Sequence, residues 1–213
     1  MTMKFQDIRD AVITLLGTYA GSDFRVLGYQ DPSKAAETVL DESRLVEAYF
    51  KRGEFPKSGG ALNGPFDHEI TINLDLTVGK ASEGDLAILD NPSADPEDIK
   101  TALADYKEAK QLADRSLDEL FDKVWIILMA ANHMDLGMSE KVSSRWIPDM
   151  EKDDPVRLGQ YIILTGSTRL TCRVQEESTG VIPVPGEKFE GEIRVEDNTN
   201  EGRAGILVDN ATP

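Results

Sequence analysis

Apolar and polar side chains alternate strictly through residues 69–78, with the apolar residues at the even positions. Successive side chains of a β-strand point to opposite faces, so this period of two predicts a strand with one apolar and one polar face. Residues 45–51 predict a partner strand in which Val46, Ala48 and Phe50 share a face. Together the two segments predict a long β-hairpin.

The segment that joins these strands, residues 53–65, contains four glycines and two prolines and is much longer than a hairpin turn requires. Long irregular loops in compact domains are usually functional or disordered. A phosphate-binding loop would need a lysine and a hydroxyl side chain directly after its last glycine. Here Pro65 and Phe66 follow, and the segment lies between two strands rather than between a strand and a helix. The sequence therefore favours a flexible loop.

A long helix is predicted after the hairpin. Asp95 can cap its N-terminus, and Pro96 is tolerated in the first helical turn. Apolar residues then recur every three or four positions. We expect the helix to be exposed at its start and deeply buried at residues 125–129. It should end near residues 132–137, where Gly137 can supply a left-handed cap.

The remaining elements are shorter. Helical periodicity predicts an amphipathic helix over residues 5–21, and a short strand is predicted at residues 24–29. Residues 149–155 form a charged turn after Trp146. Apolar and β-branched residues then predict two further strands, at residues 160–164 and 169–175.

The predicted fold is α+β: a mixed, largely antiparallel sheet of about four to five strands with two helices packed on it, in the order α-β-β-β-α-β-β. Residues 1–177 form a single domain. It carries an acidic insertion at residues 80–98, whose glycine and prolines are typical of a linker. Residues 178–213 have few apolar residues and predict an extended C-terminal arm.

The net charge of the chain limits the classes of function that it could have. The chain has 213 residues, of which 40% are apolar, and its 23 basic and 39 acidic residues give a net charge of −16. This balance argues against binding to duplex nucleic acid, which requires a basic surface. Residues 81–135 hold 13 acidic and five basic residues, or half of the net charge. A solvated helix face is the favoured interpretation of that segment.

Nothing in the sequence indicates export or membrane insertion. The N-terminus lacks an apolar signal core, and the longest apolar run, residues 124–131, is too short to cross a bilayer. Cys172 is the single cysteine and lies in phase with Leu170 and Val174, so a buried small hydrophobic side chain is expected. These features indicate synthesis in a reducing cytoplasm.

Candidate metal sites fail on inspection. Residues 197–202 vaguely resemble a calcium loop, but Val208 occupies the twelfth position, where a glutamate is required. Asp149, Glu151, Asp153 and Asp154 favour a solvated turn over a cation site. No cofactor and no metal is therefore predicted.

Catalysis has equally little support. The chain has two histidines, His68 and His133, and neither has a serine or cysteine at a recognisable spacing. The sequence therefore does not predict an enzyme. His133 has a structural interpretation, because a charged histidine stabilises the C-terminal end of a helix.

Interface residues are the remaining candidates. Lys51, Arg52 and Lys57 form a basic island at the base of the long loop, which is either a docking patch for an acidic neighbour or a solvated strand end. Arg145 and Trp146 are a second candidate anchor at an interface, and Trp146 could equally belong to the core. The predicted interface set is Lys51, Arg52, Lys57, Gly59, Gly60, Leu62, Arg145 and Trp146.

The element order resembles that of the tail terminator, or tail completion, proteins of long-tailed bacteriophages. Four segments carry the resemblance: residues 4–12, 45–50, 69–74 and 169–176. It covers most of residues 4–177 as an arrangement of elements. The insertion at 80–98 and the C-terminal arm are longer than the compact family pattern.

The resemblance implies a structural virion protein of the tail and neck, assembled in the host cytoplasm. Such subunits form a hexameric ring that caps the tail tube, ends tube polymerisation and provides the surface for head–neck joining. The implied partners are further copies of the chain, the tail tube protein and the head–neck connector. DNA would pass through the lumen as cargo, and no membrane is involved. An acidic lumen would limit adhesion to DNA.

Three alternatives remain open at this point. The chain could be another neck or head–tail adaptor subunit of a phage. It could be a small enzyme or ligand-binding domain, with a site between the glycine-rich loop and the helix end at His133 that involves His68 and Asp149. It could also be an adaptor outside phages whose acidic helix and tail bind a basic partner.

Overall fold

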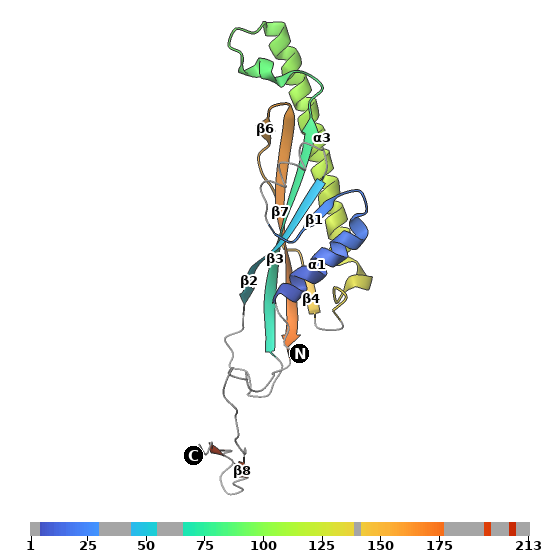
Figure 1. The fold of residues 1–213 in the computed structure, drawn as a ribbon, viewed down its shortest axis with the longest axis vertical. Coiled ribbons are helices and arrows are strands. Elements are labelled where there is room, and N and C mark those ends of the chain that lie inside the picture. Colours follow the sequence, from blue (N-terminus) through green and yellow to red (C-terminus); the bar gives the residue numbers. More distant parts are fainter. Residues whose placement is uncertain are drawn as a thin grey trace, which may run out of the picture. The chain divides into compact units, whose positions relative to one another are not determined.

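A computed structural model describes residues 5–29, 44–54, 66–138, 142–176, 194–196 and 205–207 (Figure 1). The chain divides into two compact units, Met1–Ser178 and Thr179–Pro213. The second unit contains one antiparallel pair, β8 (Arg194–Glu196) with β9 (Gly205–Leu207). All other described elements belong to the first unit.

The first unit is built on one seven-stranded sheet whose main order is β1-β2-β3-β7-β4. The strands are β1 (Arg25–Leu27), β2 (Arg44–Glu54), β3 (Phe66–Ala81), β4 (Val142–Trp146), β5 (Met150–Lys152), β6 (Val156–Leu158) and β7 (Tyr161–Glu176). The β1–β2 pair is parallel, and the other pairs are antiparallel. β4, β5 and β6 follow one another along the outer edge of β7.

The predicted fold class, element order and pair of helices are confirmed. The sheet has seven strands rather than about four to five, because β4, β5 and β6 are too short to give a periodic signal. The two strands predicted at residues 160–164 and 169–175 form one strand, β7, and the charged turn at residues 149–155 contains β5.

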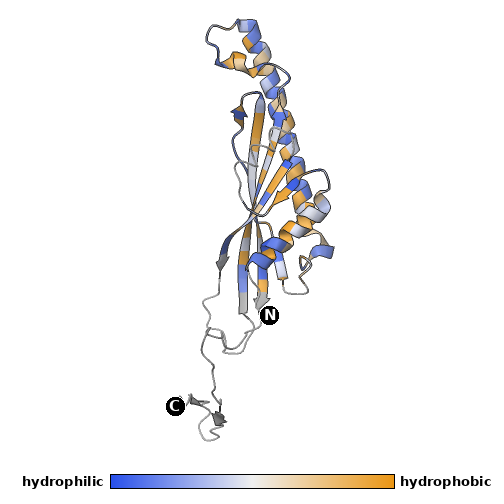
Figure 2. Cartoon of the chain, in the orientation of Figure 1, coloured by the Kyte–Doolittle hydropathy of each residue, from blue (hydrophilic) through white to orange (hydrophobic). Residues whose placement is uncertain are grey.

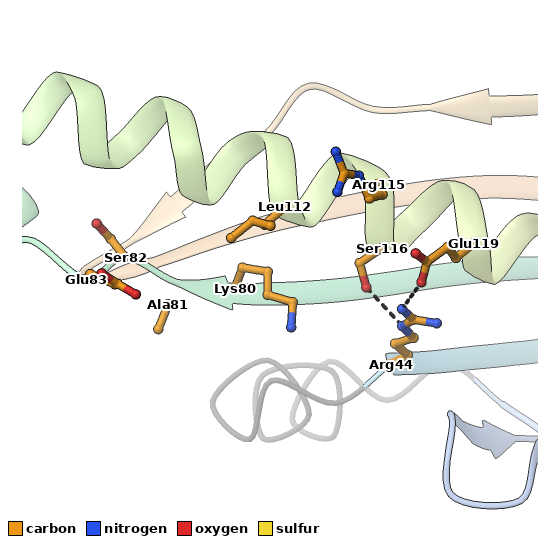
Figure 3. A pocket seen from close by; sticks show the side chains of 9 residues that line it. All are labelled: Arg44, Lys80, Ala81, Ser82, Glu83, Leu112, Arg115, Ser116 and Glu119. Atoms are coloured by element: carbon orange, nitrogen blue, oxygen red, sulfur yellow. Dashed lines mark hydrogen bonds and ion pairs between the residues drawn. The ribbon is translucent and has the colours of Figure 1, made fainter.

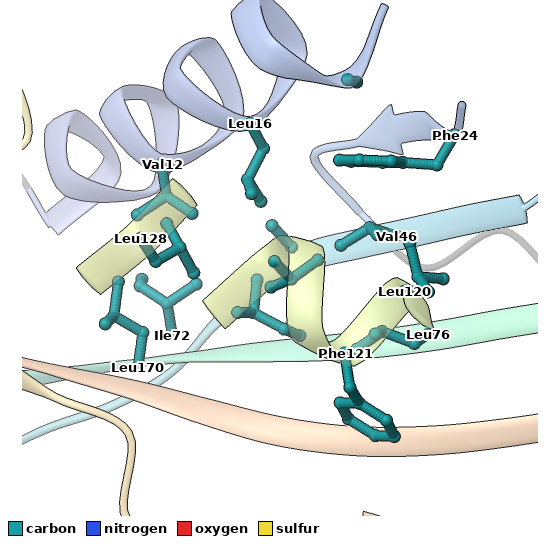
Figure 4. Packing of buried hydrophobic residues seen from close by; sticks show 14 of the residues in the cluster. Val12, Leu16, Phe24, Val46, Ile72, Leu76, Leu120, Phe121, Leu128 and Leu170 are labelled. Carbon is teal, nitrogen blue, oxygen red and sulfur yellow. The ribbon is translucent and has the colours of Figure 1, made fainter. Parts of the chain in front are cut away.

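One face of the sheet is covered by α1 (Phe5–Ala20) and α3 (Pro96–Met129), as Figures 1 and 4 show. We call this the helix-covered face and the other the open face. The apolar residues at the even positions from 70 to 78 of β3 all point to the helices and are at most 1% exposed. The core includes Ile8, Val12, Leu16, Val46, Ala48, Ile70, Ile72, Leu74, Leu76, Val78, Leu117, Leu120, Phe121, Val124, Leu128, Leu164, Leu170, Cys172 and Val174.

Burial of Cys172 agrees with its apolar phase. The side chain lies in the core, and burial raises the pKa of its thiol to about 12. The thiol is therefore protonated at neutral pH and packs as a small hydrophobic group.

A close approach of α3 to β7 depends on Gly166. A Cβ atom at this position would lie 2.7 Å from Cζ of Phe121 and 2.9 Å from the carbonyl oxygen of Glu151. Both distances are shorter than van der Waals contact, so glycine lets the Phe121 ring rest on the strand. This requirement explains a glycine in the middle of a 16-residue strand.

The start of α3 is as predicted, and its end is not. Asp95 Oδ1 accepts a hydrogen bond from the Glu97 amide at 2.9 Å, which caps the N-terminus. The helix ends at Met129, and the 3₁₀ helix η2 (Ala131–His133) follows. Gly137 does have a left-handed φ of 73°, but it lies in the turn after η2.

The expected deep burial at residues 125–129 holds only for Leu128, which is fully buried. Trp125 and Ile126 are 48% and 60% exposed, and residues 127 and 129 are half-buried. A continuous apolar run does not change the helical period, so only one stripe of it can face the sheet. Figure 2 shows hydrophilic and hydrophobic residues alternating along α3. None of the helices in the described ranges is both long and apolar enough to span a membrane.

The predicted insertion at residues 80–98, whose glycine and prolines are typical of a linker, contains regular structure. β3 continues to Ala81, and the 3₁₀ helix η1 (Leu86–Asp90) follows it. Leu86 is fully buried and forms a small second core with Ala109 and Ile162. The insertion therefore packs against the first half of α3 and the start of β7.

Candidate functional site

The predicted basic island begins at the end of β2. Lys51 and Arg52 are both exposed, and the pairing of β2 with β3 shifts register between Phe50 and Arg52. Such a bulge bends the strand and redirects its side chains. Arg52 lies opposite Thr71, which places it on the open face. Four other predicted interface residues, Lys57, Gly59, Gly60 and Leu62, lie outside the described residues.

Arg145 has a clear structural task. Its guanidinium donates hydrogen bonds to the carbonyl oxygens of Ala130, at 2.6 Å, and of His133. These carbonyls lie just beyond the end of α3, and each also accepts a backbone hydrogen bond, Ala130 from the His133 amide and His133 from the Leu136 amide. Burial lowers the pKa of the Arg145 side chain. Arg145 thus fastens the end of the long helix to β4, and its role at an interface stays a prediction.

The Trp146 side chain lies on the opposite face of the sheet from Arg145. It pairs with Thr171 of β7, whereas Arg145 pairs with Cys172, so consecutive residues of β4 serve opposite faces of the sheet. Trp146 is partly exposed on the open face. Because the two residues are adjacent in the sequence, they were predicted to form one anchor. Successive side chains of a strand point to opposite faces, so the two side chains lie apart.

His133 connects the two helices. Its Nδ1 lies 3.0 Å from the Ile127 carbonyl oxygen, and its Nε2 lies 3.0 Å from the Tyr19 hydroxyl oxygen. The two rings also contact each other, with centroids 4.8 Å apart. Both ring nitrogens are therefore engaged in holding η2 against the end of α1.

The residues of the alternative ligand site do not converge. His68 is buried and lies opposite Val174, on the helix-covered face. Asp149 forms an ion pair with Arg169, whose position in β7 places it on the open face. His68 and the Arg169 partner of Asp149 therefore lie on opposite faces of the sheet, and His133 is engaged with the two helices.

The open face carries a polar network at its centre. Asn73 Nδ2 donates to the Tyr49 hydroxyl at 3.1 Å, and that hydroxyl donates to Asp75 Oδ2 at 2.9 Å. Burial raises the pKa of the Tyr49 phenol, and the neighbouring Asp75 carboxylate raises it further. The hydroxyl therefore keeps its proton and acts as a donor. Thr71 and Thr171 lie beside this network, with their hydroxyl oxygens 3.4 Å apart.

A pocket of about 430 Å³ lies between α3 and the adjoining parts of β2 and β3 (Figure 3). Arg44 crosses it and donates to Ser116 Oγ at 2.9 Å and to Glu119 Oε2 at 2.6 Å. The hydrogen bond and the charge of Arg44 lower the pKa of the Glu119 carboxyl. The lining residues are Arg44, Lys80, Ala81, Ser82, Glu83, Leu112, Arg115, Ser116 and Glu119.

The pocket lining has no arrangement typical of catalysis. It combines basic and acidic side chains with two serines, and it contains neither a histidine nor a cysteine. Ser116 accepts a hydrogen bond from Arg44, which ties it to the ion pair of Arg44 with Glu119. Arg44 was not predicted as a site residue, because a single arginine at the start of a strand belongs to no recognisable motif.

Residues of the charged turn at 149–155 accept hydrogen bonds from threonine side chains of β7. Asp153 Oδ2 accepts from the Thr165 hydroxyl at 2.7 Å, and the Asp149 carbonyl oxygen accepts from the Thr168 hydroxyl at 2.6 Å. Within the described ranges, no group of three or more acidic, histidine or cysteine side chains could hold a metal ion.

No model of a protein family matches the chain, and no curated protein matches it. The function must therefore be argued from the fold and the surface.

Proposed function

We propose that this chain is a structural subunit of a bacteriophage tail, of the tail terminator type. In this proposal it forms a ring, hexameric in the family it resembles, that caps the tail tube, ends tube polymerisation and joins the tail to the head–neck connector. One observation carries the proposal. A helix, a short strand, a long-looped hairpin, a long helix and the terminal strands occur in that order around a single mixed sheet.

The hairpin supplies a rigid base for its connecting segment. β2 and β3 stay paired as far as Glu54 and Glu69, so residues 55–65 begin and end at a fixed position on the sheet. Loops held by a rigid scaffold commonly carry binding function.

The surface chemistry supports a structural role over the alternative of a small enzyme. In the described part of the chain, His133 holds the helices together and Arg145 fastens the end of α3. The net charge of −16 suits a ring through which DNA passes, because like charges limit adhesion to phosphates.

Binding to tail tubes tests this proposal. The full-length protein would be mixed with tubes assembled from the tube protein encoded beside its gene, and then imaged by electron microscopy. We expect a ring at one end of each tube and no further growth at that end. A strictly monomeric protein that never binds tubes would rule the proposal out.

A further inference from the structure

The open face of the sheet becomes apolar at one end. Val156 of β6 lies opposite Ile163 of β7, and Leu158 lies opposite Tyr161. We call these four residues the apolar corner. Val156 and Leu158 are 60% and 51% exposed. Cross-strand neighbours lie about 5 Å apart, so the four side chains form one continuous surface.

Acidic residues border the apolar corner. Asp153 and Asp154 are exposed and directly precede Pro155 and Val156 in the chain. Glu83 is exposed and follows Ser82, whose amide donates to the Gln160 carbonyl oxygen at the turn that joins β6 to β7. We call Glu83, Asp153 and Asp154 the acidic rim.

A surface of complementary character lies at the other end of the same sheet. Lys51 and Arg52 are exposed, and Trp146 is partly exposed in the same cross-strand row of the open face, because Arg52 pairs with Thr71, Thr71 with Thr171 and Thr171 with Trp146. We call Lys51, Arg52 and Trp146 the basic end. Arg52 pairs with Thr71 and Ile163 pairs with Gly79, so eight residues of β3 separate the two surfaces. At the usual rise of a strand, this separation is about 26 Å.

We propose that the apolar corner and acidic rim of one copy dock on the basic end of the next copy. The apolar centres exclude water, and the opposite charges around them fix the orientation. A contact between two different surfaces is head-to-tail, and it closes into a ring when the rotation between copies permits. This inference rests on the proposed ring and names the surfaces that would form it.

Two charge-reversed variants test the contact. In the first, Lys51→Glu and Arg52→Glu make the basic end acidic. In the second, Glu83→Lys and Asp154→Lys make the rim basic. We expect each variant alone to lose the high-mass species that the wild-type chain forms in light scattering. We expect an equimolar mixture to regain it, because each reversed surface then meets an oppositely charged one on the other variant.

Lys107→Glu with Lys110→Glu is the matched control for the first variant, because these exposed lysines lie on α3 and give the same change in net charge. We expect this control to assemble like the wild type. Circular dichroism would show that every variant is folded. Leu158→Ser probes the apolar corner without a change in charge, and we expect it to weaken assembly.

The outcomes separate this inference from the proposed function. If the wild type and both charge-reversed variants assemble equally well, the proposed contact is wrong and the proposed function survives. The proposed contact is also wrong if the two variants are folded but their equimolar mixture does not regain the high-mass species. If the wild-type chain is always a monomer, the ring fails, and the contact fails with it.

Discussion

Arg145 shows how a single side chain can fix the position of a long helix. The guanidinium supplies two charged N–H donors from β4 to the carbonyl oxygens of Ala130 and His133, just beyond the last turn of α3. The residue was predicted as an interface anchor because arginine and tryptophan are enriched at interfaces. Its register opposite Cys172 instead directs it toward the helix end.

Replacement of Arg145 by alanine should destabilise the protein. It would remove the charged donor from the carbonyl oxygens of Ala130 and His133, which would keep only their backbone donors, the amides of His133 and Leu136. Hydrogen bonds to charged groups contribute about 1.5–3 kcal/mol each, and the remaining backbone bonds reduce the net loss. We expect the free energy of unfolding in urea to fall by roughly 2–3 kcal/mol. Lys51→Ala is the control, because an exposed substitution changes stability by about 0.5 kcal/mol or less. Equal stabilities of the two variants would contradict the role assigned to Arg145.

Contacts between helices and strands depend on residues that hydrophobic periodicity and local turn or cap signals do not identify. The alternation in β3 was visible because five buried apolar residues follow one another at a period of two. The cap at Asp95 was visible because aspartate before proline has a local chemical meaning. β5 and β6 have three residues each, and they exist because β7 offers them an edge. Such tertiary pairing leaves no periodic signal.

The same limit applies to the candidate surfaces. Lys51 and Arg52 could be identified from their charge in an acidic chain. The apolar corner could not, because Val156 and Leu158 become neighbours of Ile163 and Tyr161 only after β6 folds back on β7. The exposure of Trp125 was also hidden, since hydropathy alone does not say which stripe of a helix meets the sheet.

Gly166→Ala should destabilise the contact between α3 and β7. The added methyl group would overlap the Phe121 ring and the Glu151 carbonyl oxygen. Overpacking of this kind costs about 1–3 kcal/mol, measurable as a lower midpoint of urea unfolding. Gly17→Ala is the matched control, because nothing lies within 4 Å of its Cβ position in α1 and alanine favours helix. A Gly166→Ala variant as stable as the control would contradict the close approach.

Shortening of the segment between β2 and β3 separates folding from assembly. Deletion of residues 58–63, which lie outside the described residues, should change stability by only about 0.6 kcal/mol, because loop closure depends weakly on length. Under the proposed function, the variant should fail to cap tail tubes in electron micrographs. A variant that keeps the length but replaces these residues with glycine and serine tests their identity. Normal capping by the deletion variant would remove the loop from the proposal.

At the scale of the whole molecule, some of the acidic side chains form ion pairs within the fold, and a surplus of negative charge remains. Lys152 of β5 lies 2.8 Å from an Asp114 oxygen and 2.6 Å from an Asp118 oxygen, so part of the acidic face of α3 is tied to the sheet. Exposed ion pairs of this kind contribute little to stability. The surplus of negative charge therefore bears mainly on which partners the surface attracts or repels.

Self-assembly is the central claim, and the mass of the full-length protein in solution tests it most directly. Size-exclusion chromatography with light scattering would be run over a wide range of protein concentrations. We expect a closed species with the mass of six chains that does not grow as concentration rises. A monomer at every concentration, or a series of oligomers that lengthens without limit, would contradict the closed ring.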